Sequence, residues 1–169
     1  MSPYQTIGTA RLLLTPIGGA DLPDLRSIKA DPRVFAVMLG GVRNAAQTAE
    51  DLAQYVRGWG ANGHGIWAVR ERAGNRFVGI TGLEDRPDGR GVGLRFAFWP
   101  EVQGHGYARE AASAALRFGH DRARLKRIVA VSRESNFASR TVLGSIGMRH
   151  VEHFVQNGHK MILFESMRA

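Results

Sequence analysis

A strand-like segment, a glycine-containing loop and a helix-forming segment follow one another between residues 94 and 118. Residues 94–99 are apolar or aromatic except Arg95, as in a strand, and residues 103–108 lead directly into the helical segment. Gly104 and Gly106 can adopt a positive φ, which lets a ligand approach the backbone closely. Inward-pointing loop amides and the start of a helix together attract an anion such as a pyrophosphate. The segment therefore predicts an anion pocket beside a sheet with a helical crossover.

The chain contains neither of two common phosphate-binding motifs. The spacing G-x-G-x-x-R lacks the third glycine of the dinucleotide-binding fingerprint, and the P-loop pattern G-x-x-x-x-G-K-[ST] occurs nowhere in the chain. Glycine loops between a strand and a helix are common, and most of them bind nothing. On local chemistry alone, an anion site and a simple connection both remain open.

Hydrophobic periodicity and turn residues predict the other elements. Strands are expected at residues 11–15, 66–70, 77–83, 92–99 and 128–132, and the arms of a closing hairpin at residues 151–155 and 161–165. Helices are expected to begin at Asp21, at Asn44 or Thr48, near Gly106 and at Asn136. This order combines an antiparallel meander with one β-α-β crossover. It predicts an α/β (α+β) fold with a single mixed, mostly antiparallel twisted sheet, helices on both faces and a C-terminal β-hairpin.

Length and composition narrow the class of protein. The 169 residues suit one domain with a sizeable core, so residues 1–169 are expected to form a single domain. The chain has no cysteine, which excludes disulfides, thiolate metal sites and an acyl-cysteine mechanism. With no signal-peptide pattern and no apolar run of membrane-spanning length, a cytoplasmic protein without a membrane partner is expected.

Two spaced motifs carry a resemblance to a known family. Residues 103–108 match the pattern Gln/Arg-x-x-Gly-x-Gly/Ala, and residues 136–139 match Asn-x-x-Ser. A glycine–aromatic pair follows the second motif in that family, and at this place the chain has Gly147-Met148, with methionine in place of the usual phenylalanine. The chain thus resembles the GNAT superfamily of N-acetyltransferases, and residues 9–14 resemble the opening strand of its ribosomal-protein N-terminal (alanine/serine) branch. The resemblance spans nearly the whole chain and implies acetyl-CoA as cosubstrate, held where the strands at 92–99 and 128–132 splay apart.

The resemblance also implies the residues of the site. The loop amides would hold the pyrophosphate, the strand backbone at residues 96–98 would pair with the pantetheine arm, and Asn136 would reach that arm from the opposite strand. Ser139 would protonate or position the departing thiolate, and Leu143 stands where other branches carry a tyrosine for that task. The residues expected to bind the cosubstrate are Phe96, Phe98, Gln103, Gly104, His105, Gly106, Tyr107, Ala108, Arg109 and Asn136.

The general base is marked less clearly than the cosubstrate site. Family members often carry a glutamate on the strand before the loop, but residues 92–95 contain no carboxylate. Glu84 is the expected catalytic carboxylate, and Asp85, Glu134 and Glu152 are further options, all four also fitting solvated surface positions. Histidine is a residue type that serves as a general base, but in a phosphate loop the amide of His105 is expected to matter rather than its ring. An α-amine, with a pKa of about 7.7–8.0, needs less help from a base than a lysine at about 10.4.

A histidine metal site is not expected on the closing hairpin. His150 and His153 have opposite parity on a strand and are expected on opposite faces. Without cysteines or nearby carboxylates, no metal is expected there or elsewhere.

Partner and acceptor remain open at the level of sequence. The acceptor can be a protein N-terminus or a small-molecule amine, and a different acyl group or a hydroxyl acceptor also fits. The formal net charge of +8 favours anionic partners and keeps open a non-catalytic acyl-CoA or nucleic-acid binding module. No helix carries dense basic residues at the spacing of a nucleic-acid reader, so nucleic acid is not the expected partner. A homodimer is compatible with the sequence.

Overall fold

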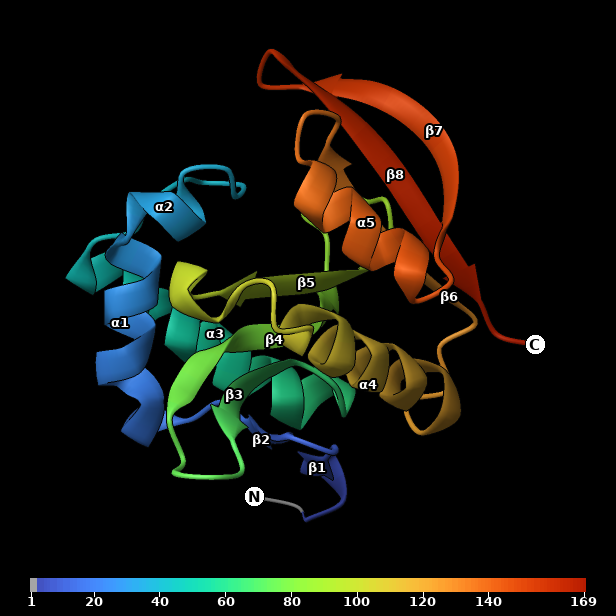
Figure 1. Cartoon of the computed structure of the whole chain (residues 1–169). Helices are drawn as coiled ribbons and strands as arrows, with labels where there is room; N and C mark the ends of the chain where they lie inside the picture. The colour runs from blue at the N-terminus through green and yellow to red at the C-terminus, as the bar shows by residue number, and fades with distance from the viewer. Residues whose placement is uncertain (1–2) are drawn as a thin grey trace.

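The computed structural model describes residues 3–169, and its elements follow the expected order (Figure 1). The strands are β1 (Ile7–Gly8), β2 (Leu12–Pro16), β3 (Ile66–Glu71), β4 (Phe77–Asp85), β5 (Val92–Phe98), β6 (Arg127–Arg133), β7 (Arg149–Gln156) and β8 (His159–Met167). The α-helices are α1 (Leu22–Ala30), α2 (Pro32–Phe35), α3 (Ala45–Asn62), α4 (Tyr107–Asp121) and α5 (Phe137–Ser145), and short 3-10 turns cover Pro3–Gln5, Gly19–Asp21 and Pro100–Val102. The sequence did not predict β1 or α2, because such short elements show no periodicity.

The strands of the described chain form one sheet in the order β1-β2-β3-β4-β5-β6-β8-β7. Neighbouring strands are antiparallel except β5 and β6, which are parallel and joined through α4. The predicted mixed, mostly antiparallel sheet with a C-terminal hairpin is therefore confirmed. β5 and β6 share a single bridge pair, Gly93 with Val129, and separate beyond it. The gap opens toward the ends of the two strands where the chain turns into α4 and α5 (Figure 1).

The core lies on both sides of the sheet, because side chains alternate along each strand. On β3, Ile66 and Ala68 belong to a cluster with buried residues of α1, α2 and α3, whereas Trp67 and Val69 belong to a cluster with α4. Four buried alanines of α4 let that helix lie close to the sheet, at Ala111, Ala112, Ala114 and Ala115. No helix in residues 3–169 is both long enough and apolar enough to cross a bilayer.

The ends of the helices test two of the predicted caps. Asn44 caps α3: its Oδ1 accepts from the amide of Gln47 at 2.8 Å, and the Gln47 side chain accepts from the Asn44 amide at 2.9 Å. Thr48, the other candidate, is buried one turn inside the helix. Asp21 does not cap α1, because its own backbone is already helical and its carboxylate accepts from the amide of Gly18 at 2.8 Å. A capping residue needs extended backbone geometry.

A β-bulge in β7 overturns the expectation for the hairpin histidines. The register shifts between His150 and Glu152, and the ring centroids of His150 and His153 lie 4.5 Å apart. The expectation of opposite faces is wrong, because the extra residue of a bulge breaks strict alternation. Within residues 3–169, no group of three or more His, Cys, Asp or Glu side chains is arranged to hold a metal ion.

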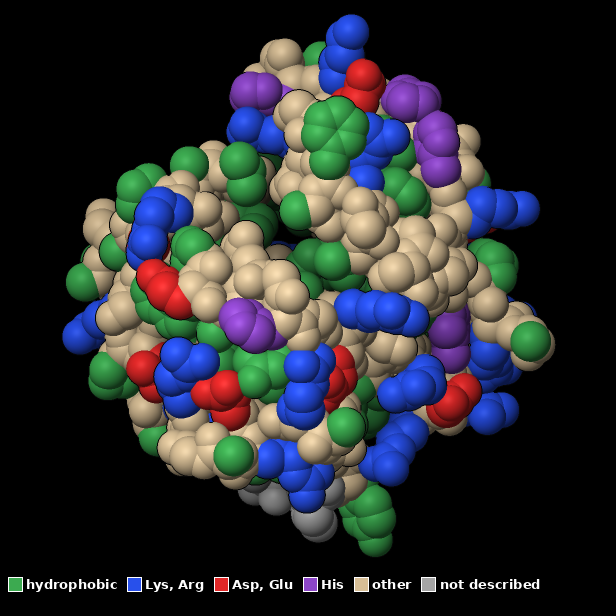
Figure 2. All heavy atoms as spheres, in the orientation of Figure 1, with side chains coloured by type: hydrophobic (Ala, Val, Ile, Leu, Met, Phe, Trp, Pro, Cys, Tyr) green, Lys and Arg blue, Asp and Glu red, His purple; other side chains and the backbone are tan. Residues whose placement is uncertain are grey.

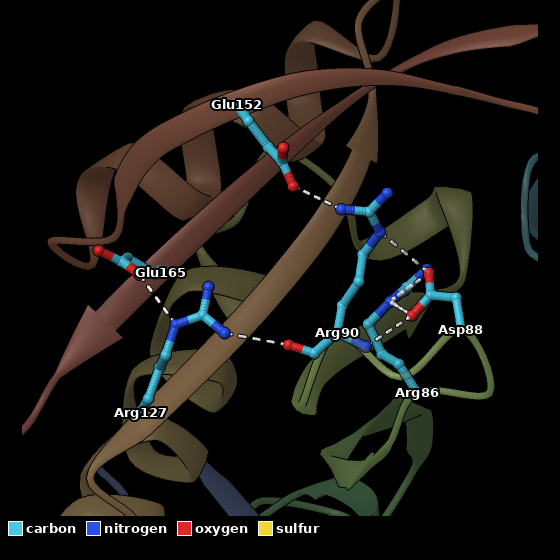
Figure 3. Close-up of polar contacts among 6 residues, drawn as sticks. All are labelled: Arg86, Asp88, Arg90, Arg127, Glu152 and Glu165. Atoms are coloured by element: carbon cyan, nitrogen blue, oxygen red, sulfur yellow. Dashed lines mark hydrogen bonds and ion pairs between the residues drawn. The ribbon is translucent and has the colours of Figure 1, made fainter.

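Side chains reinforce the junction between the two halves of the sheet. The junction cluster consists of Arg86, Asp88, Arg90, Arg127, Glu152 and Glu165 (Figure 3). Arg90, in the β4–β5 turn, pairs with Glu152 on β7, and its carbonyl accepts from Nη1 of Arg127 at 3.0 Å. Arg127 Nε lies 2.9 Å from a carboxylate oxygen of Glu165 on β8. The two contacts of Arg90 join the halves at the end of β5 and β6 that lies opposite the gap, and the pair with Glu165 holds Arg127 in place within its own half.

Candidate active site at the strand gap

The loop between β5 and α4 presents a run of free backbone amides beside the gap. Within residues 3–169, the amides of residues 104–109 make no well-formed hydrogen bond, whereas the Glu110 amide donates to the Gly106 carbonyl at 3.0 Å. Gly104 and Gly106 have φ angles of +86° and +81°, the left-handed region that favours glycine. The first amides of a helix also carry partial positive charge. This arrangement suits an anionic group such as a pyrophosphate.

Glu110 and Arg11 hold this loop in place. The Glu110 carboxylate accepts from Oγ1 of Thr9 at 2.5 Å and from the amide and Nε of Arg11, each at 2.8 Å. Nη1 of Arg11 donates to the His105 carbonyl at 2.7 Å, and its guanidinium lies 4.7 Å from the ring centroid of Tyr107. Glu110 therefore acts on the loop through Arg11 and leaves the loop amides free for a ligand.

The charge of Glu110 is part of this support. Burial alone would raise the pKa of its carboxyl, but the hydrogen bonds from Thr9 and Arg11 outweigh burial and hold the pKa below the ordinary value of 4.5. Because the folded-state pKa is depressed, the stabilisation is complete above pH 4.5 and is lost as the pH falls through the folded-state value.

We expect Glu110→Ala to weaken coenzyme A binding about tenfold at neutral pH, because Arg11 loses its partner and releases the loop. Isothermal titration measures this change. Glu101→Ala is the matched control, since Glu101 is an exposed glutamate of the preceding turn and pairs, among residues 3–169, with Arg33 and not with Arg11. The difference between the wild type and Glu110→Ala should shrink below pH 4.5 as Glu110 is protonated. Equal affinities of the wild type and Glu110→Ala at neutral pH would contradict the supporting role.

The other predicted side chains of the loop face different partners. The exposed His105 places Nδ1 3.0 Å from the Val102 carbonyl, so its ring bonds within its own loop. The Tyr107 hydroxyl donates to Glu71 at 2.6 Å. Arg109 is exposed and forms no ion pair in the described part of the chain. The predicted role of the loop thus falls on its backbone, with Arg109 as the free cation beside it.

Asn136 and Ser139 lie on the far side of the gap, at the start of α5. Oδ1 of Asn136 accepts from the Ser139 amide at 3.1 Å, so Asn136 caps the helix and keeps its own NH₂ group available as a donor. The Ser139 hydroxyl is half-buried and has no hydrogen-bond partner among residues 3–169. On the near side, β5 between Phe96 and Phe98 pairs with β4 along one edge, and its other edge faces the gap. The fold therefore brings both predicted motifs to one opening.

The Glu84 carboxylate is already paired with a cation, whereas a general base needs a carboxylate that is available to accept a proton. It lies on β4 opposite Gly93, and its carboxylate pairs with the guanidinium of Arg95 on β5. Burial would lower the pKa of Arg95, but the neighbouring Tyr55 and Glu84 raise it above its ordinary value. The catalytic role of Glu84 stays a prediction, and proton removal there requires the carboxylate to leave Arg95.

Sequence reasoning did not find the role of Arg11 or the pairing of Arg95 with Glu84. The position of Glu110 in the first turn of α4 is the one local signal for the first contact, because a carboxylate is common at a helix start. The partners in that contact are 99 residues apart in sequence.

Comparisons with known proteins agree with this geometry. A family model described as "Acetyltransferase (GNAT) domain" matches residues 11–149. The FsC-acetyl coenzyme A-N(2)-transacetylase of Aspergillus fumigatus is 30% identical over 165 aligned positions, which cover 88% of this chain and 67% of the relative.

Solved structures share the fold. A putative GNAT-family acetyltransferase from Bordetella pertussis has a TM-score of 0.85 at 23% identity, covering 98% of this chain and 99% of its own. The ribosomal-protein acetyltransferase RimL in complex with coenzyme A has a TM-score of 0.80 at 15% identity, covering 96% and 98%. Because the family model matches most of this chain, the chain belongs to the GNAT family of acetyltransferases and is an acyltransferase.

Proposed function

We propose that the chain transfers an acetyl group from acetyl-CoA directly to a primary amine while both substrates are bound. The observation that carries this proposal is the run of free amides at residues 104–109, placed where β5 and β6 separate. Use of acetyl-CoA is general in the family that matches residues 11–149. The match to an enzyme family also favours catalysis over a purely binding role, which the net charge alone left open.

Each side of the gap has a defined task in this reaction. The amides of residues 104–109 bind the pyrophosphate, and the outer edge of β5 and the NH₂ group of Asn136 orient the pantetheine arm. This positioning brings the thioester to the amine and supplies much of the acceleration. The Ser139 hydroxyl then donates its hydrogen bond to the sulfur as the thiolate departs, which stabilises the developing charge. The acceptor must arrive as a neutral amine, since no free carboxylate lies on β5.

Two measurements test the proposal. Isothermal titration with acetyl-CoA and coenzyme A should show binding, and a thiol-release assay over a panel of amines should show acetyl-dependent turnover. Absence of binding at millimolar ligand would refute the proposal. Binding without thiol release on any amine, together with salt-dependent affinity for nucleic acid, would favour a binding module.

We expect Ser139→Ala to lower kcat about tenfold or more, because a hydrogen bond to a developing negative charge contributes about 1.5–3 kcal/mol. The KM for acetyl-CoA should change little, since the pyrophosphate contacts stay intact. Ser145→Ala, in the same helix, is the matched control, because the Ser145 hydroxyl is exposed and donates to the Val142 carbonyl at 2.7 Å. Steady-state kinetics of both variants check the prediction, and equal kcat values for the two would contradict it.

A further inference from the structure

A chain of charged groups runs beneath the face of β5 that α1, α2 and α3 cover. The Lys29–Arg95 cluster consists of Lys29, Arg43, Asp51, Tyr55, Glu84 and Arg95. Nζ of Lys29 lies 2.9 Å from Oδ2 of Asp51 and donates to the Tyr55 hydroxyl oxygen at 2.6 Å. The Lys29 side chain is only 2% exposed, which is rare for a lysine on an ordinary helix. Burial of this charge is costly, and the contacts of Lys29 with Asp51 and Tyr55 offset part of the cost.

The cluster carries more positive than negative charge. Its cations are Lys29, Arg43 and Arg95, and its carboxylates are Asp51 and Glu84. Asp51 already accepts from both Lys29 and Arg43, the latter through contacts of 3.0 Å and 3.1 Å. The exposed Glu50, outside the cluster, also acts on Arg43. One positive charge is therefore left without a carboxylate, in surroundings where low dielectric strengthens its effect.

The Tyr55 hydroxyl connects the buried Lys29 with Arg95. Its phenol oxygen accepts from Lys29 and also stands beside the guanidinium of Arg95. Two cations thus share one neutral oxygen. Within residues 3–169 the phenol hydrogen has no acceptor of its own. An added anionic oxygen beside Arg95 and Tyr55 would accept from both the guanidinium and the phenol hydroxyl.

Arg95 is the most exposed cation of the cluster. Its side chain is 34% exposed and lies two residues beyond Gly93, where β5 has just separated from β6. A crevice between β5 and the segment after α2 is lined by Met38, Arg95 and Phe96, among others. Figure 2 shows the surface hollowed between the part over α2 and the part over α5 and the hairpin, with exposed apolar side chains on the α2 side. A substrate that enters from this side meets apolar surface first and Arg95 beneath it.

We propose that Arg95, backed by the Lys29–Arg95 cluster, selects acceptor amines that carry a carboxylate close to the amine, as free amino acids do. This inference rests on the proposed N-acetyltransferase function and names its acceptor class. A guanidinium binds a carboxylate through paired hydrogen bonds, and only one Arg95 nitrogen is engaged by Glu84. The same positive charge repels polyamines, which carry several cations and no carboxylate.

The test compares acceptors that differ only in the carboxylate. The protein loaded with coenzyme A is titrated with a free amino acid, its amide and its decarboxylated amine, and with a polyamine. We expect the amino acid to bind at least about tenfold more tightly than its amide, because a charge-assisted hydrogen bond is gained. Arg95→Gln should remove this preference, whereas Glu84→Gln should increase it by freeing the Arg95 guanidinium. Arg57→Gln, at an exposed arginine of α3, is the control and should retain the wild-type ratio.

The outcomes separate this inference from the proposed function. If coenzyme A binds and thiol release occurs equally with amines that lack the carboxylate, or best with the polyamine, the acceptor inference is wrong and the function stands. If Arg95→Gln fails to fold, the Glu84→Gln variant decides. An unchanged or reduced preference of that variant for the amino acid over its amide overturns the inference. If coenzyme A does not bind to the wild type, the proposed function fails first.

Discussion

Replacement of Gly106 by valine is expected to abolish measurable binding of coenzyme A. Gly106 has a φ of +81°, and a left-handed conformation costs an L-residue about 1–2 kcal/mol, with a β-branched side chain worse still. A Cβ atom there would also lie 3.3 Å from Nη2 of Arg11, the side chain that holds the loop. The loop must therefore move, and all the amides of residues 104–109 lose their common direction together. Isothermal titration with coenzyme A measures the loss.

Two variants control this experiment. His105→Ala should leave the affinity largely intact, because the backbone of His105 and not its ring contributes to the site. Gly60→Val places the same side chain at an exposed helical glycine with open space around it, and should leave both the fold and the affinity unchanged. If His105→Ala abolished binding and Gly106→Val did not, the backbone role of the loop would be refuted.

Replacement of Trp67 by alanine is expected to lower the free energy of unfolding by about 3–5 kcal/mol. Trp67 is fully buried, and its ring centroid lies 4.8 Å from that of Trp59 and 5.0 Å from that of Phe118. Its Nε1 also donates to the Gln5 carbonyl at 2.6 Å, which ties down the chain before β1. Truncation leaves a cavity between α3, β3 and α4 and removes this donor. Urea denaturation followed by circular dichroism gives the change in unfolding free energy.

Trp67→Phe is the informative companion to this variant. It keeps an aromatic ring in the cluster and loses only part of the side-chain volume, although it also loses the hydrogen bond to Gln5. Its cost should be clearly smaller than that of the alanine variant. A loss below about 1 kcal/mol for Trp67→Ala would mean that the surroundings collapse into the space, contrary to this description of the core.

Features set by local chemistry were predictable from the sequence. The start of α3 at Asn44 and the turn at Asn157-Gly158 depend on residues within a few positions of one another. Asn157 and Gly158 indeed have φ angles of +51° and +77°, as a type I′ turn requires. The strand–loop–helix order likewise depends on neighbours in the chain, whereas the position of the gap was expected from the resemblance to the GNAT superfamily.

Features set by distant contacts were not predictable in this way. Lys29 stands in the last turn of α1, where a lysine commonly faces solvent, yet Asp51 and Tyr55 of α3 hold it inside. The support of the loop by Arg11 and Glu110 depends on the pairing of β2 with β3 and the packing of α4. A single sequence carries no signal for such pairings, because each charged residue alone fits a solvated position equally well.

The junction cluster has a mechanical consequence for the gap. One backbone bridge, the ion pair of Arg90 with Glu152 and the hydrogen bond from Arg127 to the Arg90 carbonyl join the two halves of the sheet at one end, so we expect the separated strands to pivot about this end. A small rotation there becomes a larger displacement at the far ends of β5 and β6, where α4 and α5 begin. We therefore expect substitutions of Arg90, Arg127 or Glu152 to change the width of the opening from a distance. Salt screens exposed ion pairs more than backbone hydrogen bonds, so we expect it to weaken the Arg90–Glu152 contact and to affect the width of the opening in the same way.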